Sequence, residues 1–167
     1  FSGSCSRSVI IASGARPRKL DIPGEEAFWA KGVSSSAVCD GAFFRDVPLA
    51  VVAGGASAMA EATFLPKFRS KVTIVHRRDE LRASKIMQER AFNDPKVEFL
   101  WNHTVEEVVG NDDGVTHLKV KDVNSGEVSD LPVQGFFLAI GHIPNTTIFE
   151  GQIDMDEEGY ILTAPDS

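Results

Sequence analysis

The sequence predicts an α/β fold, in which a central parallel sheet carries helices on one side and a β-meander on the other. Leu49–Val52 is a continuous apolar run, as buried parallel strands are, and it leads through a glycine turn into the alanine-rich stretch 58–68. A second strand and a second helix then follow, and after them come alternating segments and a last apolar strand. This order is typical of nucleotide-binding α/β domains.

Composition and charge narrow the class of protein. The 167 residues suit one domain or slightly more, and a hydrophobic share of 43% with a charged share of 25% is typical of a soluble globular protein. The net charge of −7 argues against nucleic acid and anionic membranes as partners, because both attract a basic face. No apolar run reaches the roughly 20 residues that a membrane span needs.

The elements before the glycine turn are short. Residues 8–15 form a β-branched run that ends in small residues, which predicts a buried strand followed by a turn. Residues 16–24 contain two prolines and are interpreted as a crossing segment. Residues 25–31 predict a short helix that Gly32 would end, and 37–44 predict a compact stretch around Cys39.

The elements after the glycine turn are longer. Pro66 is expected to kink or end the helix that contains it. Residues 71–75 predict a second strand, and residues 84–92 predict a helix whose Ile86 and Met87 face the core. The remaining strands are expected at 96–100, 105–109, 114–123, 128–133 and 135–140.

The glycine turn is the first candidate binding feature. A dinucleotide pyrophosphate needs bare backbone at such a turn and free N–H groups at a helix start, where the dipole favours negative charge. Ala53, Gly55 and Ala58 occupy the three key places of the Gly-x-Gly-x-x-Gly/Ala fingerprint, so its first glycine is missing. Taken alone, the pattern fits an ordinary tight turn equally well. The residues expected to face a pyrophosphate are Gly54, Gly55, Ser57 and Ala58.

The end of the second strand indicates which nucleotide is bound. A cofactor without a 2′-phosphate usually meets an acidic residue there, about 20 residues past the glycines. This chain has His76, Arg77 and Arg78 instead, with Arg82 further on. Guanidinium groups suit a phosphate dianion, so the sequence predicts NADPH rather than NADH. The alternative interpretation is a solvated basic face at a strand end.

Together these motifs resemble the NADPH domain of low-molecular-weight thioredoxin reductases, over nearly the whole chain. The matching segments are Gly54-Gly55-x-Ser57-Ala58-Met59-x-Glu61-Ala62, His76-Arg77-Arg78-Asp79, Arg82-Ala83-Ser84-Lys85-Ile86-Met87, Ala139-Ile140-Gly141-His142-x-Pro144-Asn145 and Gly159-Tyr160-Ile161. The residues at positions 28–29 and 85–88 favour the plant, algal or fungal members of this family. The resemblance implies a Rossmann-like NADPH-binding domain, with Ile140, Gly141 and Tyr160 as further cofactor contacts.

The family's activity suggests roles for a second group of residues. In that family, NADPH reduces FAD, the flavin reduces a Cys-x-x-Cys disulfide, and the resulting dithiol reduces thioredoxin. Cys39 matches the second redox cysteine, and Asp40 matches the carboxyl group that acts as general acid beside it. Family members are homodimers, whereas this piece alone is expected to be a monomer. The expected location is the cytoplasm, with the chloroplast stroma as the alternative.

The sequence departs from the family pattern at four positions. Ser36 stands in place of the first redox cysteine, so the dithiol cycle cannot close. Ala53, Ala56 and Ala60 stand where the family has Gly, Asp and Glu, which predicts a weakened cofactor turn. We therefore expect the isolated chain to be inactive. The alternative is a non-catalytic module that binds a nucleotide or thioredoxin, and Cys39 is either an accessible thiol or a buried, inert one.

The resemblance also predicts where the domains divide. Residues 1–18 are expected to be a linker from a flavin domain, 19–138 the NADPH-binding domain, and 139–167 the start of the second half of the flavin domain. On this interpretation FAD is held only by the full-length protein. His103 and His117 are interpreted as surface or internally bonded histidines, and no metal site is expected.

Overall fold

A computed structural model describes residues 7–52, 55–68 and 71–164. The chain divides into two compact units. The larger unit is Arg18–Gly141, and the smaller one combines Phe1–Pro17 with His142–Ser167.

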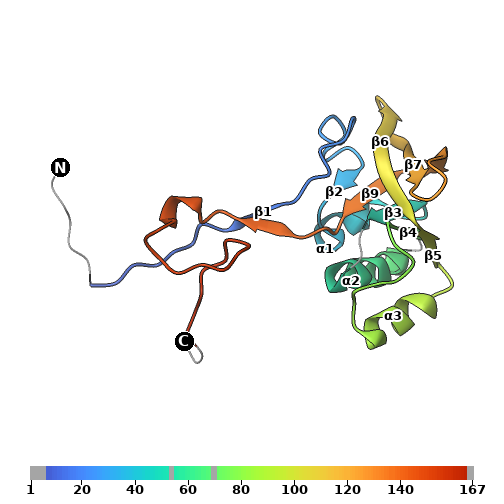
Figure 1. Cartoon of the computed structure of the whole chain (residues 1–167). Helices are drawn as coiled ribbons and strands as arrows, with labels where there is room; N and C mark the ends of the chain where they lie inside the picture. The colour runs from blue at the N-terminus through green and yellow to red at the C-terminus, as the bar shows by residue number, and fades with distance from the viewer. Residues whose placement is uncertain (1–6, 53–54, 69–70, 165–167) are drawn as a thin grey trace. The chain divides into compact units, whose positions relative to one another are not determined.

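The larger unit is built on a five-stranded sheet in which every pairing is parallel (Figure 1). The strands in spatial order are β2 (Val33–Ser34), β9 (Gly135–Leu138), β3 (Leu49–Val52), β4 (Val72–His76) and β5 (Val97–Trp101). All of β9 and most of β3 are buried, as their continuous apolar sequences require. The predicted parallel α/β sheet is confirmed.

Helices cover one face of this sheet. They are α1 (Ala37–Asp40), α2 (Ala56–Phe64) and α3 (Lys85–Phe92). Ala58, Met59 and Ala62 of α2 are fully buried against that face. The α-helix ends at Phe64 and a 3-10 turn follows over Leu65–Phe68, so Pro66 does end the helix.

One prediction for α3 was wrong. Ile86 is 65% exposed, whereas Met87 packs against the core and Ala91 is fully buried. Met87 and Ala91 are four residues apart and therefore share one face of the helix, while Ile86 lies about 100° away from Met87.

A three-stranded antiparallel meander covers the other face: β6 (His103–Asn111), β7 (Gly114–Asp122) and β8 (Val128–Pro132). Because side chains alternate along a strand, β3 sends Val51 to the helix side and Ala50 to the meander side. The buried meander residues that pack there include Val105, Val108 and Leu118. Helices on one side and a meander on the other are therefore confirmed.

The buried strand predicted at 8–15 was wrong. The described residues up to Gly14 form no strand, and Val9 and Ile10 are 77% and 92% exposed. The strand is instead β1 (Ala15–Pro17), which pairs antiparallel with β10 (His142–Pro144). A β-branched run becomes a buried strand only if another element covers it, and none does so among the described residues.

The helix predicted at 25–31 was also wrong. The segment is a series of turns, in which Phe28 N–H donates to Gly24 O and Lys31 N–H donates to Phe28 O. Ala30 has a φ of 61° and Gly32 a φ of 129°, values that end any right-handed helix. This turn segment packs on the meander, since Val108 N–H donates to Pro23 O at 2.9 Å.

Candidate functional site

A cavity of about 750 Å³ lies in the larger unit, at the carboxyl ends of its parallel strands. Ligands of open α/β sheets bind at this edge, because the loops that leave the strands diverge there. The cavity residues that follow β3, β4 and β9 are Gly55, Ser57, His76, Arg77, Arg78, Arg82, Ala139, Ile140 and Gly141. The remaining lining residues are Arg18, Leu20, Ile22, Val52, Val75, His103, Thr104 and Val105.

The start of α2 offers bare backbone to this cavity. Gly55 precedes the helix with a φ of −111°, a conformation open to any residue, and a Cβ added to it would meet nothing within 4 Å. Packing within the protein therefore does not require glycine here, whereas a ligand seated against the backbone would. Ser57 is exposed in the first helical turn, while Ala58 is fully buried and does not line the cavity. Ala53 and Gly54 lie outside the described residues.

Cationic side chains follow β4. Arg77, Arg78 and Arg82 are exposed, and all three line the cavity. His76 is only 7% exposed, and its Nε2 lies 2.9 Å from the carbonyl oxygen of Glu80. Because a carbonyl only accepts, Nε2 carries the hydrogen and His76 braces the turn that bears the arginines.

Residues from the beginning and the end of the larger unit, Arg18 and Gly141 among them, also line the cavity. Ile140 and Gly141 follow β9, and Gly141 has a φ of 99°. Its carbonyl accepts a hydrogen bond from Arg18 N–H at 2.9 Å, which joins the first and last residues of the unit. Tyr160 belongs to the smaller unit, where it is 42% exposed.

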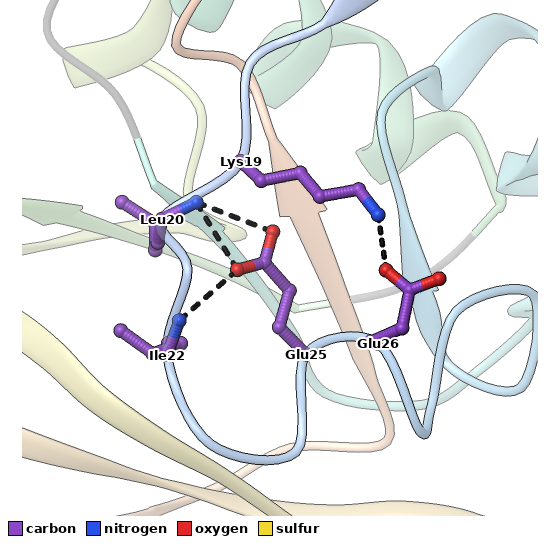
Figure 2. A network of polar contacts seen from close by, with 5 residues as sticks. All are labelled: Lys19, Leu20, Ile22, Glu25 and Glu26. Atoms are coloured by element: carbon purple, nitrogen blue, oxygen red, sulfur yellow. Dashed lines mark hydrogen bonds and ion pairs between the residues drawn. The ribbon is translucent and has the colours of Figure 1, made fainter.

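A buried carboxylate organises the loop that carries Leu20 and Ile22. Glu25 is 2% exposed, and its oxygens accept hydrogen bonds from Leu20 N–H at 3.1 and 3.2 Å and from Ile22 N–H at 3.4 Å. Figure 2 shows this carboxylate pointing at the two backbone nitrogens, while Lys19 reaches Glu26. The hydrogen bond that Lys19 donates to the Glu26 carboxylate raises the pKa of Lys19.

Sequence reasoning missed Glu25, which holds the loop bearing Leu20 and Ile22, and His103, which lines the cavity. Glu25 was assigned to a helix, although a charged residue directly after Pro23 and Gly24 could have indicated a turn bonded to its own backbone. His103 was interpreted as a surface or internally bonded residue. Asn102 alone separates His103 from the end of β5. The argument that placed Arg77 and Arg78 at the carboxyl ends of parallel strands would therefore have placed His103 there too.

The predicted redox residues lie together in and beside α1. Ser36 caps this one-turn helix, and its Oγ accepts a hydrogen bond from Cys39 N–H at 3.4 Å. Asp40 accepts a hydrogen bond from Ser34 Oγ at 2.5 Å. Cys39 is a free thiol and is exposed, so the alternative that Cys39 is buried was wrong.

A carboxyl group on α2 contacts the same segment. Burial raises the pKa of Glu61 to about 7, because it penalises the charged form, and a hydrogen bond from the Ala37 backbone partly opposes this shift. The other side-chain oxygen, Oε2, is buried without a hydrogen-bond partner. Ala37 opens α1, so Glu61 links α2 to the helix that bears Cys39.

A parallel sheet with arginines at its carboxyl edge is typical of dinucleotide-binding domains. The family model described as pyridine nucleotide-disulphide oxidoreductase matches residues 4–167, and the chain belongs to this family.

Its relatives within that family are thioredoxin reductases. The chain is 55% identical to "Thioredoxin reductase" of Streptomyces coelicolor, covering 93% of this chain and 48% of that protein. It is 52% identical to "Thioredoxin reductase 2" of Arabidopsis thaliana, covering 95% and 43%. The structure of Lactococcus lactis thioredoxin reductase superposes with a TM-score of 0.83 at 44% identity, covering 90% and 50%.

The chain thus spans about half the length of the relatives it matches. Bacterial and plant relatives are similarly close, so the plant, algal or fungal origin stays a prediction. In the part of the chain that the structure describes, no helix has the length and apolar character needed to cross a bilayer.

Proposed function

We propose that the chain is the NADPH-binding part of a thioredoxin reductase, the full protein of which transfers electrons from NADPH through FAD to thioredoxin. The observation that carries this proposal is the cavity in which Arg77, Arg78 and Arg82 face the same space as the open backbone at Gly55. In such a protein bound NADPH and FAD supply the reducing electrons, and FAD is held outside the segment 19–138.

The lining residues suit the parts of NADPH in turn. Arg77, Arg78 and Arg82 bind the 2′-phosphate, because their guanidinium forks match a phosphate dianion. The N–H groups that open α2 face the pyrophosphate, with Ser57 beside them. The other proposed contacts are Gly54, Ala58, His76, Ile140, Gly141 and Tyr160.

Cys39 and Asp40 are proposed to carry the thiol chemistry. The Cys39 thiolate attacks the thioredoxin disulfide, a new sulfur–sulfur bond forms as the thioredoxin bond breaks, and the leaving thiolate takes a proton from Asp40 or water. Completing the cycle needs a second thiol to release thioredoxin, and Ser36 supplies only a hydroxyl. The isolated chain is therefore proposed to form a mixed disulfide with thioredoxin without turnover.

Calorimetric titration of this chain with NADPH and with NADH tests the cofactor assignment. We expect tighter binding of NADPH, and loss of that preference by about tenfold or more in an Arg77→Ala, Arg78→Ala double variant, since hydrogen bonds to charged groups are the strong ones. Arg90→Ala, an exposed arginine of α3 outside the cavity, is the matched control and should leave the ratio unchanged. An unchanged NADPH/NADH ratio in the double variant contradicts the proposal.

A second candidate function is a non-catalytic module that binds a nucleotide or thioredoxin, and Ser36 is the observation that favours it. Replacing Ser36 by Cys within a full-length flavoprotein distinguishes the two. Recovery of thioredoxin reduction supports the reductase, whereas bound FAD without recovery supports the module. The full-length protein is proposed to be a homodimer of the cytoplasm, with the chloroplast stroma as the alternative, and this piece alone a monomer.

A further inference from the structure

We propose that His103 is an additional ligand of the 2′-phosphate of NADPH, next to Arg77 and Arg78. This inference rests on the proposed function and extends the same site. His103 is the first residue of β6 and lines the cavity together with the arginines. Because side chains alternate along a strand, His103 shares the side of β6 that carries the buried Val105.

The path of the chain holds His103 close to the arginine segment. Asn102 alone separates β5 from β6, and its φ of 57° reverses the chain in one residue. Asn102 N–H donates a hydrogen bond to the carbonyl of Arg78 at 3.3 Å, and Asn102 O accepts one from Val123 N–H at 2.8 Å. The backbone itself therefore joins the turn after β4 to the start of β6.

The imidazole ring is oriented toward a ligand by its own backbone contact. Nδ1 of His103 lies 2.6 Å from the carbonyl oxygen of Trp101. A carbonyl only accepts, so Nδ1 carries a hydrogen, and Nε2 is the ring atom left for a ligand. A phosphate dianion also only accepts, and therefore the ring that meets it is the doubly protonated cation.

The surrounding charges support that cation once phosphate is bound. Asp122 lies opposite His103 in the β6–β7 pairing, and the charge of His103 contributes to the lowered pKa of Asp122, after the backbone hydrogen bonds from Ser125 and Asn124. The opposing charges come from arginines that line the same cavity: Arg18, Arg77, Arg78 and Arg82. A bound phosphate offsets these positive charges, so the imidazole ring and the arginines can bind the same anion.

Two substitutions separate phosphate binding from a structural role. The amide of Asn places an N–H near the position of Nδ1 and nothing at Nε2, so His103→Asn keeps the bond to Trp101 O and removes the phosphate contact. Gln reaches the position of Nε2 with a neutral donor. His117→Gln, on β7 and outside the cavity, is the matched control.

The probes are adenosine 2′,5′-bisphosphate and 5′-AMP, each titrated calorimetrically into the full chain. For the bisphosphate we expect His103→Asn to bind about tenfold more weakly than the parent chain and His103→Gln to lie between them, because a charged hydrogen bond is lost. Binding of 5′-AMP should not change in either variant.

The outcomes distinguish this inference from the proposed function. In one outcome the parent chain prefers the bisphosphate, and the Arg77, Arg78 double variant loses that preference. If His103→Asn then binds the bisphosphate like the parent chain, only the role of His103 is overturned. An equal loss for both probes would make His103 structural and would also overturn it. No preference in the parent chain contradicts the proposed function, and the inference with it.

Discussion

The proposed nucleotide cavity and the segment around Cys39 are built in opposite ways. The cavity takes its walls from segments spread between Arg18 and Gly141, and backbone hydrogen bonds brace several of them. The Cys39 segment is one helical turn with an exposed thiol, held by the Ser34–Asp40 bond, the Ser36 cap and the contact from Glu61. Binding is therefore tied to the fold as a whole, whereas the reactivity of the thiol depends on a few local bonds.

The largest effect should come from substituting Gly24, which lies two residues after the cavity residue Ile22 and packs against Val108. A Cβ there would lie 1.9 Å from the carbonyl oxygen of Val108, and φ is +81°. We expect Gly24→Ala to destabilise the chain by about 3 kcal/mol or more in chemical unfolding, through clash and strain together. Gly126→Ala is the control, because it has a similar φ of +76° but open space around it. A similar loss in both variants would show that φ alone is responsible.

Removing the Glu25 carboxylate, which Figure 2 shows beside the backbone nitrogens of Leu20 and Ile22, should have the next largest effect. Glu25→Ala leaves the Leu20 and Ile22 N–H groups without their acceptor, at a cost of about 2 kcal/mol. NADPH affinity should fall as well, since both residues line the cavity. Glu26→Ala removes only the exposed pair with Lys19, which solvent screens, so it should cost much less than Glu25→Ala. Equal melting temperatures for the two variants would contradict the assigned role of Glu25.

On the Cys39 side, Glu61 predicts a pH dependence. Its pKa of about 7 in the folded chain lies above the ordinary 4.5, so between these values the folded state holds a proton that the unfolded state lacks. Stability should therefore fall as pH rises from 4.5 to 7. In Glu61→Gln that fall should shrink by about 1 kcal/mol, after discounting for partial solvent exposure. Unfolding titrations at several pH values, with Glu89→Gln as control, measure the difference; identical slopes would contradict it.

The smallest effect should come from the cap of α1. Ser36→Ala removes an acceptor that lies 3.4 Å from Cys39 N, a long hydrogen bond. We expect a loss of about 0.5 kcal/mol, confined to this turn, with roughly twofold faster hydrogen exchange at the Cys39 amide and an unchanged melting temperature. Ser35→Ala should leave that exchange rate unchanged. A large drop in melting temperature would show that α1 is coupled to the whole domain.

The sequence predicted a segment's structure correctly where the residues of that segment themselves determine its place in the fold. The apolar run Leu49–Val52 could only be a central strand, and Pro66 had to end a helix wherever that helix packed. The arginines after β4 could be placed at the cavity because strand ends in a parallel sheet share one edge.

It failed where the outcome depends on distant partners. Residues 8–15 have strand-like composition, but among the described residues only Ala15 of this run joins a strand, as the first residue of β1. Ala30 adopts a left-handed conformation that no residue preference predicts. The burial of Glu61 likewise follows from the packing of α2 beside α1, and its sequence neighbours do not reveal it. Cofactor contacts at Gly54 and Tyr160 stay predictions.

Gly55 has a consequence for how substitutions in this chain would be ranked. Among the described residues an added Cβ meets no atom within 4 Å, and the backbone conformation suits any residue. A screen that selects only for folding should therefore treat this position as freely variable. A screen that selects for nucleotide retention should find it intolerant. The difference between the two substitution maps, position by position, would outline the cofactor's footprint without any bound structure.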